Sequence, residues 1–201
     1  DNKIKKEARY QQYFGIKKTL ERISTFDSTG KRNGGLIWHT QGSGKSLTMV
    51  MLARALRRRI NTTKIVIVTD RKDLDSQIKK TFAHSGFADD IVQAKSGEHL
   101  DGVLKPNQSK IITTIINKFD KVFNKGKILD DANVFVLVDE SHRTQNGLLH
   151  TKMKKVFPSG CYVGFTGTPL MKKEKNSFSQ FGKEIHRYTI NQAVDDKAVL
   201  P

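Results

Sequence analysis

A glycine-rich run at residues 39–46 holds the residue types that are best suited to binding an anion. Glycines such as Gly42 and Gly44 tolerate backbone dihedrals that let successive N–H groups curl around a phosphate. Lys45 can then pair with the β- and γ-phosphates of a nucleotide, and the Ser46 hydroxyl can coordinate Mg²⁺. The run therefore predicts a phosphate-binding loop. Its expected residues are Thr40, Gln41, Gly42, Ser43, Gly44, Lys45 and Ser46.

The run departs from the general pattern of such loops at one position, because His39 stands where that pattern has a glycine. A chance occurrence of the same residues in a surface loop is the alternative interpretation. The run lies between an expected strand and an expected helix, which is the context that a phosphate-binding loop requires.

Two adjacent carboxylates, Asp139 and Glu140, follow the apolar run at residues 134–138. Asp139 could hold Mg²⁺ directly or through water, and Glu140 could polarise an attacking water as a general base. Such a pair is often only the start of a helix. Together with the phosphate loop at another strand end, it predicts one magnesium–nucleotide site, with Lys45, Asp139 and Glu140 as catalytic residues and Ser46 and Asp139 as metal ligands.

The elements that must position these residues follow an alternation of short apolar runs and helix-like segments. That alternation is typical of a parallel sheet with crossover helices, in which ligands collect beyond the carboxyl ends of the strands. We expect one α/β domain over residues 1–201, with a mostly parallel central sheet. The expected strands are 36–39, 64–69, 110–114, 134–138 and 162–166, the expected helices are 7 to about 23 and about 44 to 60, and the expected loops are 27–35, 97–110 and 171–175.

The overall charge is strongly positive, since 36 Lys and Arg residues face 20 Asp and Glu residues, a net charge of +16. This balance favours a polyanionic partner such as nucleic acid or an anionic membrane surface, although a solubilising surface has the same composition. No run of the sequence approaches the roughly 20 apolar residues of a membrane-spanning helix. Cys161 is the single cysteine, so we expect a buried thiol, and the scattered histidines lack metal-ligand spacing.

The Asp-Glu-Ser-His box at residues 139–142, with the phosphate loop before it and residues 164–169 after it, resembles the first RecA-like domain of a superfamily 2 helicase or translocase. Within that superfamily, residues 38–46 and 139–143 are similar to the restriction (motor) subunit of type I restriction-modification enzymes, a family that would also show a histidine at His39. The resemblance covers nearly the whole chain and implies a three-layer RecA-like P-loop NTPase domain. The other segments that carry it are 9–14, 181–182, 185–188, 193–196 and 199–201.

The resemblance also implies roles for individual residues. Arg9 would help to frame an adenine pocket and Gln12 would hydrogen-bond the adenine edge, with an ordinary amphipathic helix as the alternative. Four further residues would couple the nucleotide state to movement between two RecA-like domains. A tight turn is the alternative for residues 166–168, and a satisfied surface histidine is the alternative for His142. The expected coupling residues are His142, Thr166, Gly167 and Thr168.

Two loops that follow expected strands resemble the DNA-contact motifs of the family. Arg71 and Lys72 follow the strand at 64–69, and Thr114 ends the strand before the second motif. Basic groups and hydroxyls at loop–helix junctions suit contacts with DNA phosphates, which position DNA without reading its sequence. A capped helix start, with Asp70 or Thr114 as the cap, is an equal alternative at both positions.

The resemblance implies a motor domain that binds and hydrolyses ATP with Mg²⁺ and drives duplex DNA translocation before a separate nuclease domain cuts the DNA. Its expected partners are duplex DNA and the methylation and specificity subunits of a restriction complex in the bacterial or archaeal cytoplasm, with no membrane. The family would place the nuclease before this chain and a second RecA-like domain, with its arginine finger, after it. Two alternatives stay open: another superfamily 2 helicase or repair translocase, and a nucleotide-gated DNA-binding module, against which the general base Glu140 argues.

Overall fold

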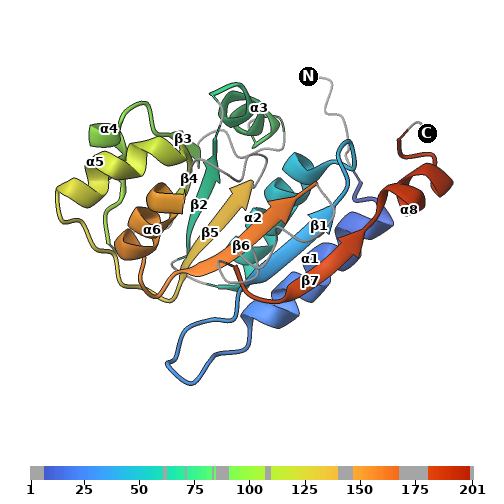
Figure 1. Ribbon diagram of the computed structural model, residues 1–201, viewed down its shortest axis with the longest axis horizontal. Coiled ribbons are helices and arrows are strands. Elements are labelled where there is room, and N and C mark those ends of the chain that lie inside the picture. Colours follow the sequence, from blue (N-terminus) through green and yellow to red (C-terminus); the bar gives the residue numbers. More distant parts are fainter. Residues whose placement is uncertain are drawn as a thin grey trace.

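A parallel β-sheet forms the middle layer of the domain (Figure 1). The computed structural model describes residues 7–60, 63–70, 72–82, 84, 91–106, 110–139, 147–167 and 181–199. The strands are β1 (Gly35–His39), β2 (Lys64–Thr69), β3 (Ile91–Gln93), β4 (Lys110–Ile115), β5 (Val134–Asp139), β6 (Cys161–Thr166) and β7 (Glu184–Tyr188). Within the described residues the sheet has seven strands in the order β3-β4-β2-β5-β6-β1-β7, and every pairing between neighbours is parallel, which confirms the expected α/β class.

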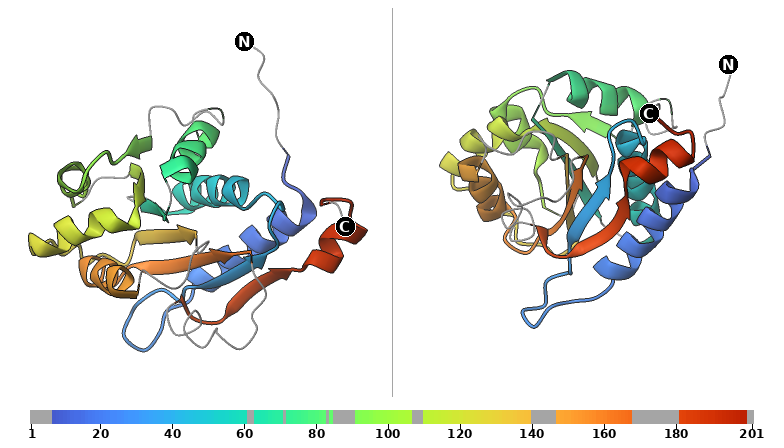
Figure 2. Two further views of the ribbon diagram at one scale, coloured as in Figure 1. Left: turned by 45° about the horizontal axis from the view of Figure 1, so that its top comes forward. Right: turned by 45° about the vertical axis from the view of Figure 1, so that its right-hand side comes forward.

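Helices cover both faces of this sheet, so the domain has three layers (Figure 2). The helices are α1 (Tyr10–Ile23), α2 (Lys45–Arg59), α3 (Lys72–Phe82), α4 (Gly97–Val103), the 3-10 helix η2 (Ile116–Lys118), α5 (Phe119–Asn124), α6 (Gly147–Val156) and α8 (Ile190–Asp195). One face of the sheet packs against α1, α2 and α3. The other face packs against α4, η2, α5 and α6.

The strand sequences explain why both faces are covered. All six residues of β2 are buried; Ile65 and Ile67 belong to the core on the α2 side, and Val66 and Val68 belong to the core on the α5 side. Because side chains alternate across a strand, an unbroken apolar run is stable only where both faces are buried. Cys161, at the start of β6, is buried as expected, and burial raises the pKa of its thiol to about 12.

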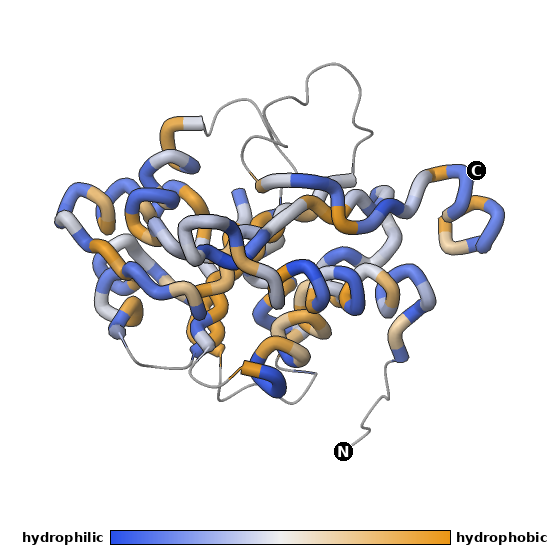
Figure 3. Tube along the Cα trace, turned by 90° about the horizontal axis from the view of Figure 1, so that it is seen from below, coloured by the Kyte–Doolittle hydropathy of each residue, from blue (hydrophilic) through white to orange (hydrophobic). Residues whose placement is uncertain are grey.

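The helices beside the candidate loop form because apolar positions recur on one side. α2 buries Met49, Leu52 and Leu56, which are three and four residues apart, and its last turn carries arginines where the helix dipole favours positive charge. Figure 3 shows the resulting alternation of hydrophobic and hydrophilic residues along the helical turns. α1 begins later than expected, where the Gln12 side chain accepts a hydrogen bond from the backbone N–H of Arg9 at 2.9 Å.

Two outer strands lie outside the expected strand ranges, and one helix lies in a segment that was expected to be a loop. β3 and β7 are the edges of the sheet, and four of the five residues of β7 are not fully buried, so neither strand has the long apolar run of an inner strand. The expected loop at 97–110 is wrong, because it contains α4. Ser96 caps this helix by accepting a hydrogen bond from the backbone N–H of His99 at 3.1 Å, and Leu100 is buried beneath it.

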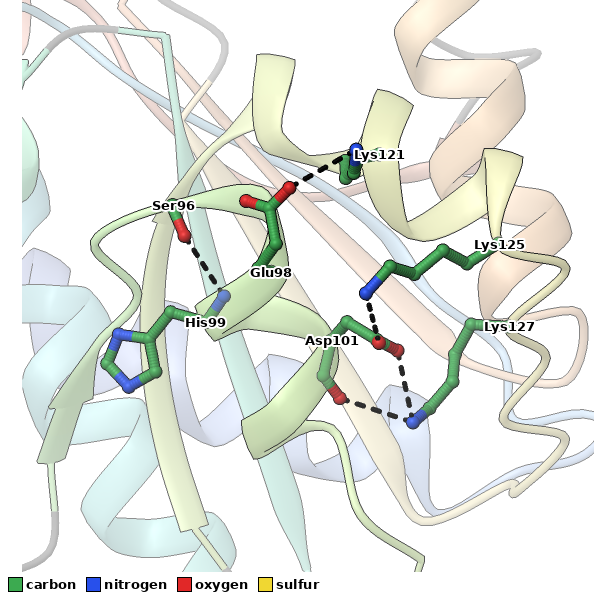
Figure 4. Close-up of polar contacts among 7 residues, drawn as sticks. All are labelled: Ser96, Glu98, His99, Asp101, Lys121, Lys125 and Lys127. Atoms are coloured by element: carbon green, nitrogen blue, oxygen red, sulfur yellow. Dashed lines mark hydrogen bonds and ion pairs between the residues drawn. The ribbon is translucent and has the colours of Figure 1, made fainter.

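Ion pairs join α4 to α5 and to the turn that follows it (Figure 4). Glu98 pairs with Lys121 at 3.3 Å, and Asp101 pairs with Lys125 at 3.1 Å and with Lys127 at 3.2 Å. The hydrogen bond from Lys125 is the main reason why the pKa of Asp101 lies below its usual range. Pairs that are this accessible to solvent contribute little to stability, so α4 is held mainly by its buried apolar side.

Replacing Gly34 with alanine is expected to destabilise the domain, because the added Cβ would meet the backbone carbonyl oxygen of Tyr162 in β6. We expect the free energy of unfolding, measured by urea denaturation, to fall by about 1–3 kcal/mol, the usual range for overpacking. Gly102→Ala is the matched control, since a Cβ at this position in α4 meets nothing within 4 Å. It should stabilise the helix by roughly 0.5–1 kcal/mol. Similar losses in both variants would contradict this account.

Candidate nucleotide-binding site

The glycine-rich run forms the connection between β1 and α2. Gly42 and Gly44 have φ values of +83° and +87°, in the left-handed region that glycine adopts at little cost. Gly44 is also the N-cap of α2, so the loop leads directly into the N-terminus of this helix, where unpaired N–H groups favour an anion. Ser43 stabilises the curve by donating its hydroxyl to the carbonyl oxygen of Thr40 at 2.6 Å. The backbone therefore has the shape of an anion cradle.

Lys45, the first residue of α2, turns back over this loop. Its Nζ donates to the carbonyl oxygens of His39 and Thr40, at 3.3 Å each. Burial lowers the pKa of Lys45, and the negative charge of Asp139 acts in the opposite direction. A Cβ added to Gly167 would lie 2.9 Å from the same Nζ. The structure therefore brings the loop, the end of β5 and the end of β6 together around one ammonium group.

Gln12, which the sequence analysis assigned to adenine recognition, lies beside the loop. Its side chain is 2% exposed, and its Nε2 donates to the carbonyl oxygen of Gly44 at 3.2 Å. A Cβ on Gly44 would come within 2.7 Å of this Nε2 and would displace the Gln12 amide, while the φ of +87° is what favours glycine there. Through Gln12, α1 supports the end of the loop. Contact of Gln12 and Arg9 with an adenine base stays a prediction.

A pair of histidines at the other end of the loop was not predicted from the sequence. His39 is fully buried, and its Nε2 lies 2.8 Å from Nδ1 of His186 in β7. Burial first, and then the nearby charges of His186 and Lys45, lower the pKa of His39 to about 3. Gly15 in α1 provides space, since a Cβ there would lie 3.3 Å from Cε1 of His39. The pairing joins the last residue of β1 to an edge strand that the sequence did not predict.

The remaining expected residues lie in different surroundings. Ser46 is in the first turn of α2, next to Lys45, and Thr166 is buried at the end of β6. Lys72 is exposed at the start of α3. Thr114 is fully buried in β4 and does not cap the helix that follows; its hydroxyl donates to the carbonyl oxygen of Ile115 at 3.4 Å. A DNA contact through Lys72 or Thr114 stays a prediction.

Four of the expected site residues lie outside the described part of the chain. They come from the segment after β5, the segment after β6 and the position just before α3 in the sequence. Their proposed roles therefore stay predictions. These residues are Arg71, Glu140, His142 and Thr168.

Comparison with known proteins identifies the family to which this arrangement belongs. The sequence profile of the SWI2/SNF2 ATPase family matches residues 11–201. The chain belongs to this family. An ATPase family implies ATP as the nucleotide, and the fit is good, because the left-handed glycines leave a cradle bounded by the half-buried side chain of Lys45. Ser46 and Asp139 are oxygen donors of the kind that Mg²⁺ prefers.

Restriction enzymes are among the relatives of this SWI2/SNF2 ATPase domain. The type I restriction enzyme HindI endonuclease subunit of Haemophilus influenzae is 34% identical over 98% of this chain and 21% of its own length. The chain thus spans about a fifth of that relative. The resemblance to restriction subunits drawn from the sequence motifs is confirmed.

Solved structures support the RecA-like fold of the domain. A nuclease-deletion mutant of the Type ISP restriction-modification enzyme LlaGI, in complex with a DNA substrate mimic, has a TM-score of 0.70 at 15% identity and covers 96% of this chain and 21% of its own. The Sulfolobus solfataricus SWI2/SNF2 ATPase core in complex with dsDNA has a TM-score of 0.66 at 15% identity, over 89% of this chain and 36% of its own. No described helix is long and apolar enough to span a membrane.

The buried His39 predicts that the domain loses stability in acid. Its pKa is about 3 in the folded protein against an ordinary value of 6.5, so below pH 6.5 the unfolded chain binds a proton that the folded domain does not. The stability that neutral His39 contributes is fully present above pH 6.5 and is lost as the pH drops towards 3. Over this range the equilibrium constant for unfolding rises by up to about tenfold per pH unit. Urea denaturation between about pH 4.5 and about pH 8 measures this slope.

The matched control for this pH dependence is a histidine at the surface. His84→Gln removes an exposed imidazole and should leave the slope unchanged, whereas His39→Gln should flatten it. His186 faces the same ring and contributes in the same direction, because burial also lowers its pKa. Equal slopes in the His39→Gln variant and the unmodified protein would contradict the assignment.

Proposed function

We propose that this chain is the first motor domain of a type I restriction enzyme, which hydrolyses ATP to move duplex DNA before a separate nuclease domain cuts it. The observation that carries the proposal is the meeting of the phosphate loop, Lys45 and Asp139 at one edge of the sheet. The identity of about a third with a restriction endonuclease subunit favours this motor over other members of the SWI2/SNF2 family.

The loop would hold the triphosphate of ATP through the backbone N–H groups around Gly42 and Gly44. Lys45 is prepared for this contact, because burial disfavours its charge and its two hydrogen bonds to carbonyl oxygens are long. A phosphate oxygen would give Lys45 a negatively charged partner in place of these neutral carbonyl oxygens. Mg²⁺, held by Ser46 and Asp139, would neutralise charge on the phosphates.

Hydrolysis would use Glu140 as the general base that polarises the attacking water. A second RecA-like domain would supply an arginine finger from the other side of the nucleotide. Gly167 is well situated to couple the two, since a Cβ added there would lie 2.9 Å from Nζ of Lys45. Thr166, Thr168 and His142 would extend this coupling beyond the end of β6.

The proposed partners are duplex DNA and the methylation and specificity subunits of a restriction complex in the cytoplasm of a bacterium or archaeon. The net charge of +16 suits a polyanion, and we expect Arg71 and Lys72 to contact the phosphate backbone without reading sequence. Recognition of the DNA target would belong to the specificity subunit.

Steady-state ATP hydrolysis by the intact polypeptide tests the proposal. The polypeptide is reconstituted with its methylation and specificity subunits, with and without duplex DNA that carries the recognition site. We expect stimulation that requires both this DNA and Lys45, so that Lys45→Ala abolishes it. Hydrolysis that is indifferent to the DNA would favour another superfamily 2 role, and absence of hydrolysis would favour a binding module.

Replacing Glu140 with glutamine should separate catalysis from binding. The amide keeps the size of the side chain but cannot take up a proton, so turnover should fall by at least about 10²-fold. Equilibrium ATP affinity should stay within about twofold of the unmodified protein, since the base does not contact the phosphates in its ground state. Loss of turnover and affinity in parallel would remove Glu140 from the catalytic role.

A further inference from the structure

The first helix of the domain meets two consecutive elements near residue 190 at the carboxylate of Asp196. The hydroxyl of Tyr10, at the start of α1, donates to its Oδ2 at 2.6 Å. The hydroxyl of Tyr188, at the end of β7, donates to the same oxygen at 2.8 Å. Asp196 itself follows α8 directly. We call Tyr10, Tyr188 and Asp196 the tyrosine clasp; Figure 2 shows α8 beside the start of α1 and the end of β7.

The clasp is a charged and directional contact. The two phenol hydroxyls hold the pKa of Asp196 below its usual range, so the carboxylate is ionised and can only accept hydrogen bonds. The rings of Tyr10 and Tyr188 meet edge to face, with centroids 6.0 Å apart. Tyr188 is 1% exposed, whereas Tyr10 and Asp196 lie at the surface. Hydrogen bonds to an ionised acceptor are stronger than neutral ones.

Each element of the clasp also supports the phosphate loop. β7 contacts the start of the loop, because the backbone N–H of Thr40 donates to the carbonyl oxygen of Tyr188 at 3.0 Å. α1 contacts Gly44, the last loop residue before α2, through the hydrogen bond from Gln12. The segment after α8 reaches its middle, where a Cβ on Gly42 would lie 3.0 Å from Cγ1 of Val199.

The backbone after α8 explains how Val199 reaches the loop. Lys197 has a φ of +53°, and its N–H donates to the carbonyl oxygen of Val194 at 2.9 Å. The N–H of Ala198 donates to the carbonyl oxygen of Ala193 at 2.8 Å, which completes a left-handed helix end. This turn reverses the chain just beyond Asp196. The position of Val199 therefore depends on where Asp196 is held.

We propose that Asp196 is a positioning residue for ATP, whose carboxylate joins α1, β7 and α8 so that Gln12, Thr40 and Val199 hold the phosphate loop in its binding shape. The inference rests on the proposed function, because it takes ATP as the ligand of the loop. Asp196 acts on the loop through its hydrogen bonds with Tyr10 and Tyr188.

Equilibrium binding of ATP to the intact polypeptide, together with urea denaturation of the same samples, tests this role. Asp196→Ala should raise the dissociation constant about tenfold, as expected for loss of hydrogen bonds to a charged group. Asp196→Asn retains an acceptor oxygen and should restore most of the affinity. The double variant Tyr10→Phe with Tyr188→Phe removes both donors but keeps both rings, and it should weaken binding to the same extent as Asp196→Ala. Combining all three substitutions should add little further.

The matched control is Asp195→Ala, which removes the neighbouring carboxylate at the end of the same helix. It should leave the dissociation constant unchanged. An Asp196→Ala protein that binds ATP like the unmodified protein would overturn the inference, as would an equal loss from Asp195→Ala, or a loss of unfolding stability with no change in affinity. If the unmodified protein binds ATP no better than Lys45→Ala, the proposed function itself is wrong, and that result is distinct from the others.

Discussion

Parallel pairing of the inner strands is the constraint on which the rest of the site depends. Because β1, β5 and β6 run in the same direction, their carboxyl ends meet at one edge of the sheet. That edge holds the phosphate loop, Asp139 and Gly167, although these lie far apart in the sequence. Parallel strands need helices on both faces, so the buried apolar runs that form the core also determine where the polar residues converge.

Electrostatics inside this edge are finely balanced. Lys45 is partly removed from water, and among the described residues two carbonyl oxygens and a nearby carboxylate offset that cost. His39 is more deeply buried, and this burial lowers its pKa so that the ring is neutral. Lys45 thus keeps a positive charge that can pair with a phosphate. His39 is neutral and serves as an uncharged packing group. The difference in burial between Lys45 and His39 explains why one is charged and the other is neutral.

The inner strands and the phosphate loop could be predicted because each has a strong local signal, an unbroken apolar run or two glycines followed by Lys45. The parts that could not be predicted depend on partners that are remote in sequence. β7 has a mixed sequence since it lies at an edge, and the His39–His186 pair is visible only once β7 lies beside β1. α4 is short, and its capping residue Ser96 resembles an ordinary loop serine in the sequence. The tyrosine clasp has no sequence motif that links its three members.

The strand order also determines when the loop can be completed during synthesis. β1 is made early, yet both of its neighbours in the sheet, β6 and β7, come late, and His39 waits for a partner 147 positions further along the chain. Pairing at such separation carries a large loop-closure entropy and slows folding. On the ribosome, β2, β4 and β5 can associate first, while the nascent loop has neither edge support nor clasp. Competence to bind a nucleotide is therefore acquired only after β7 and α8 have emerged.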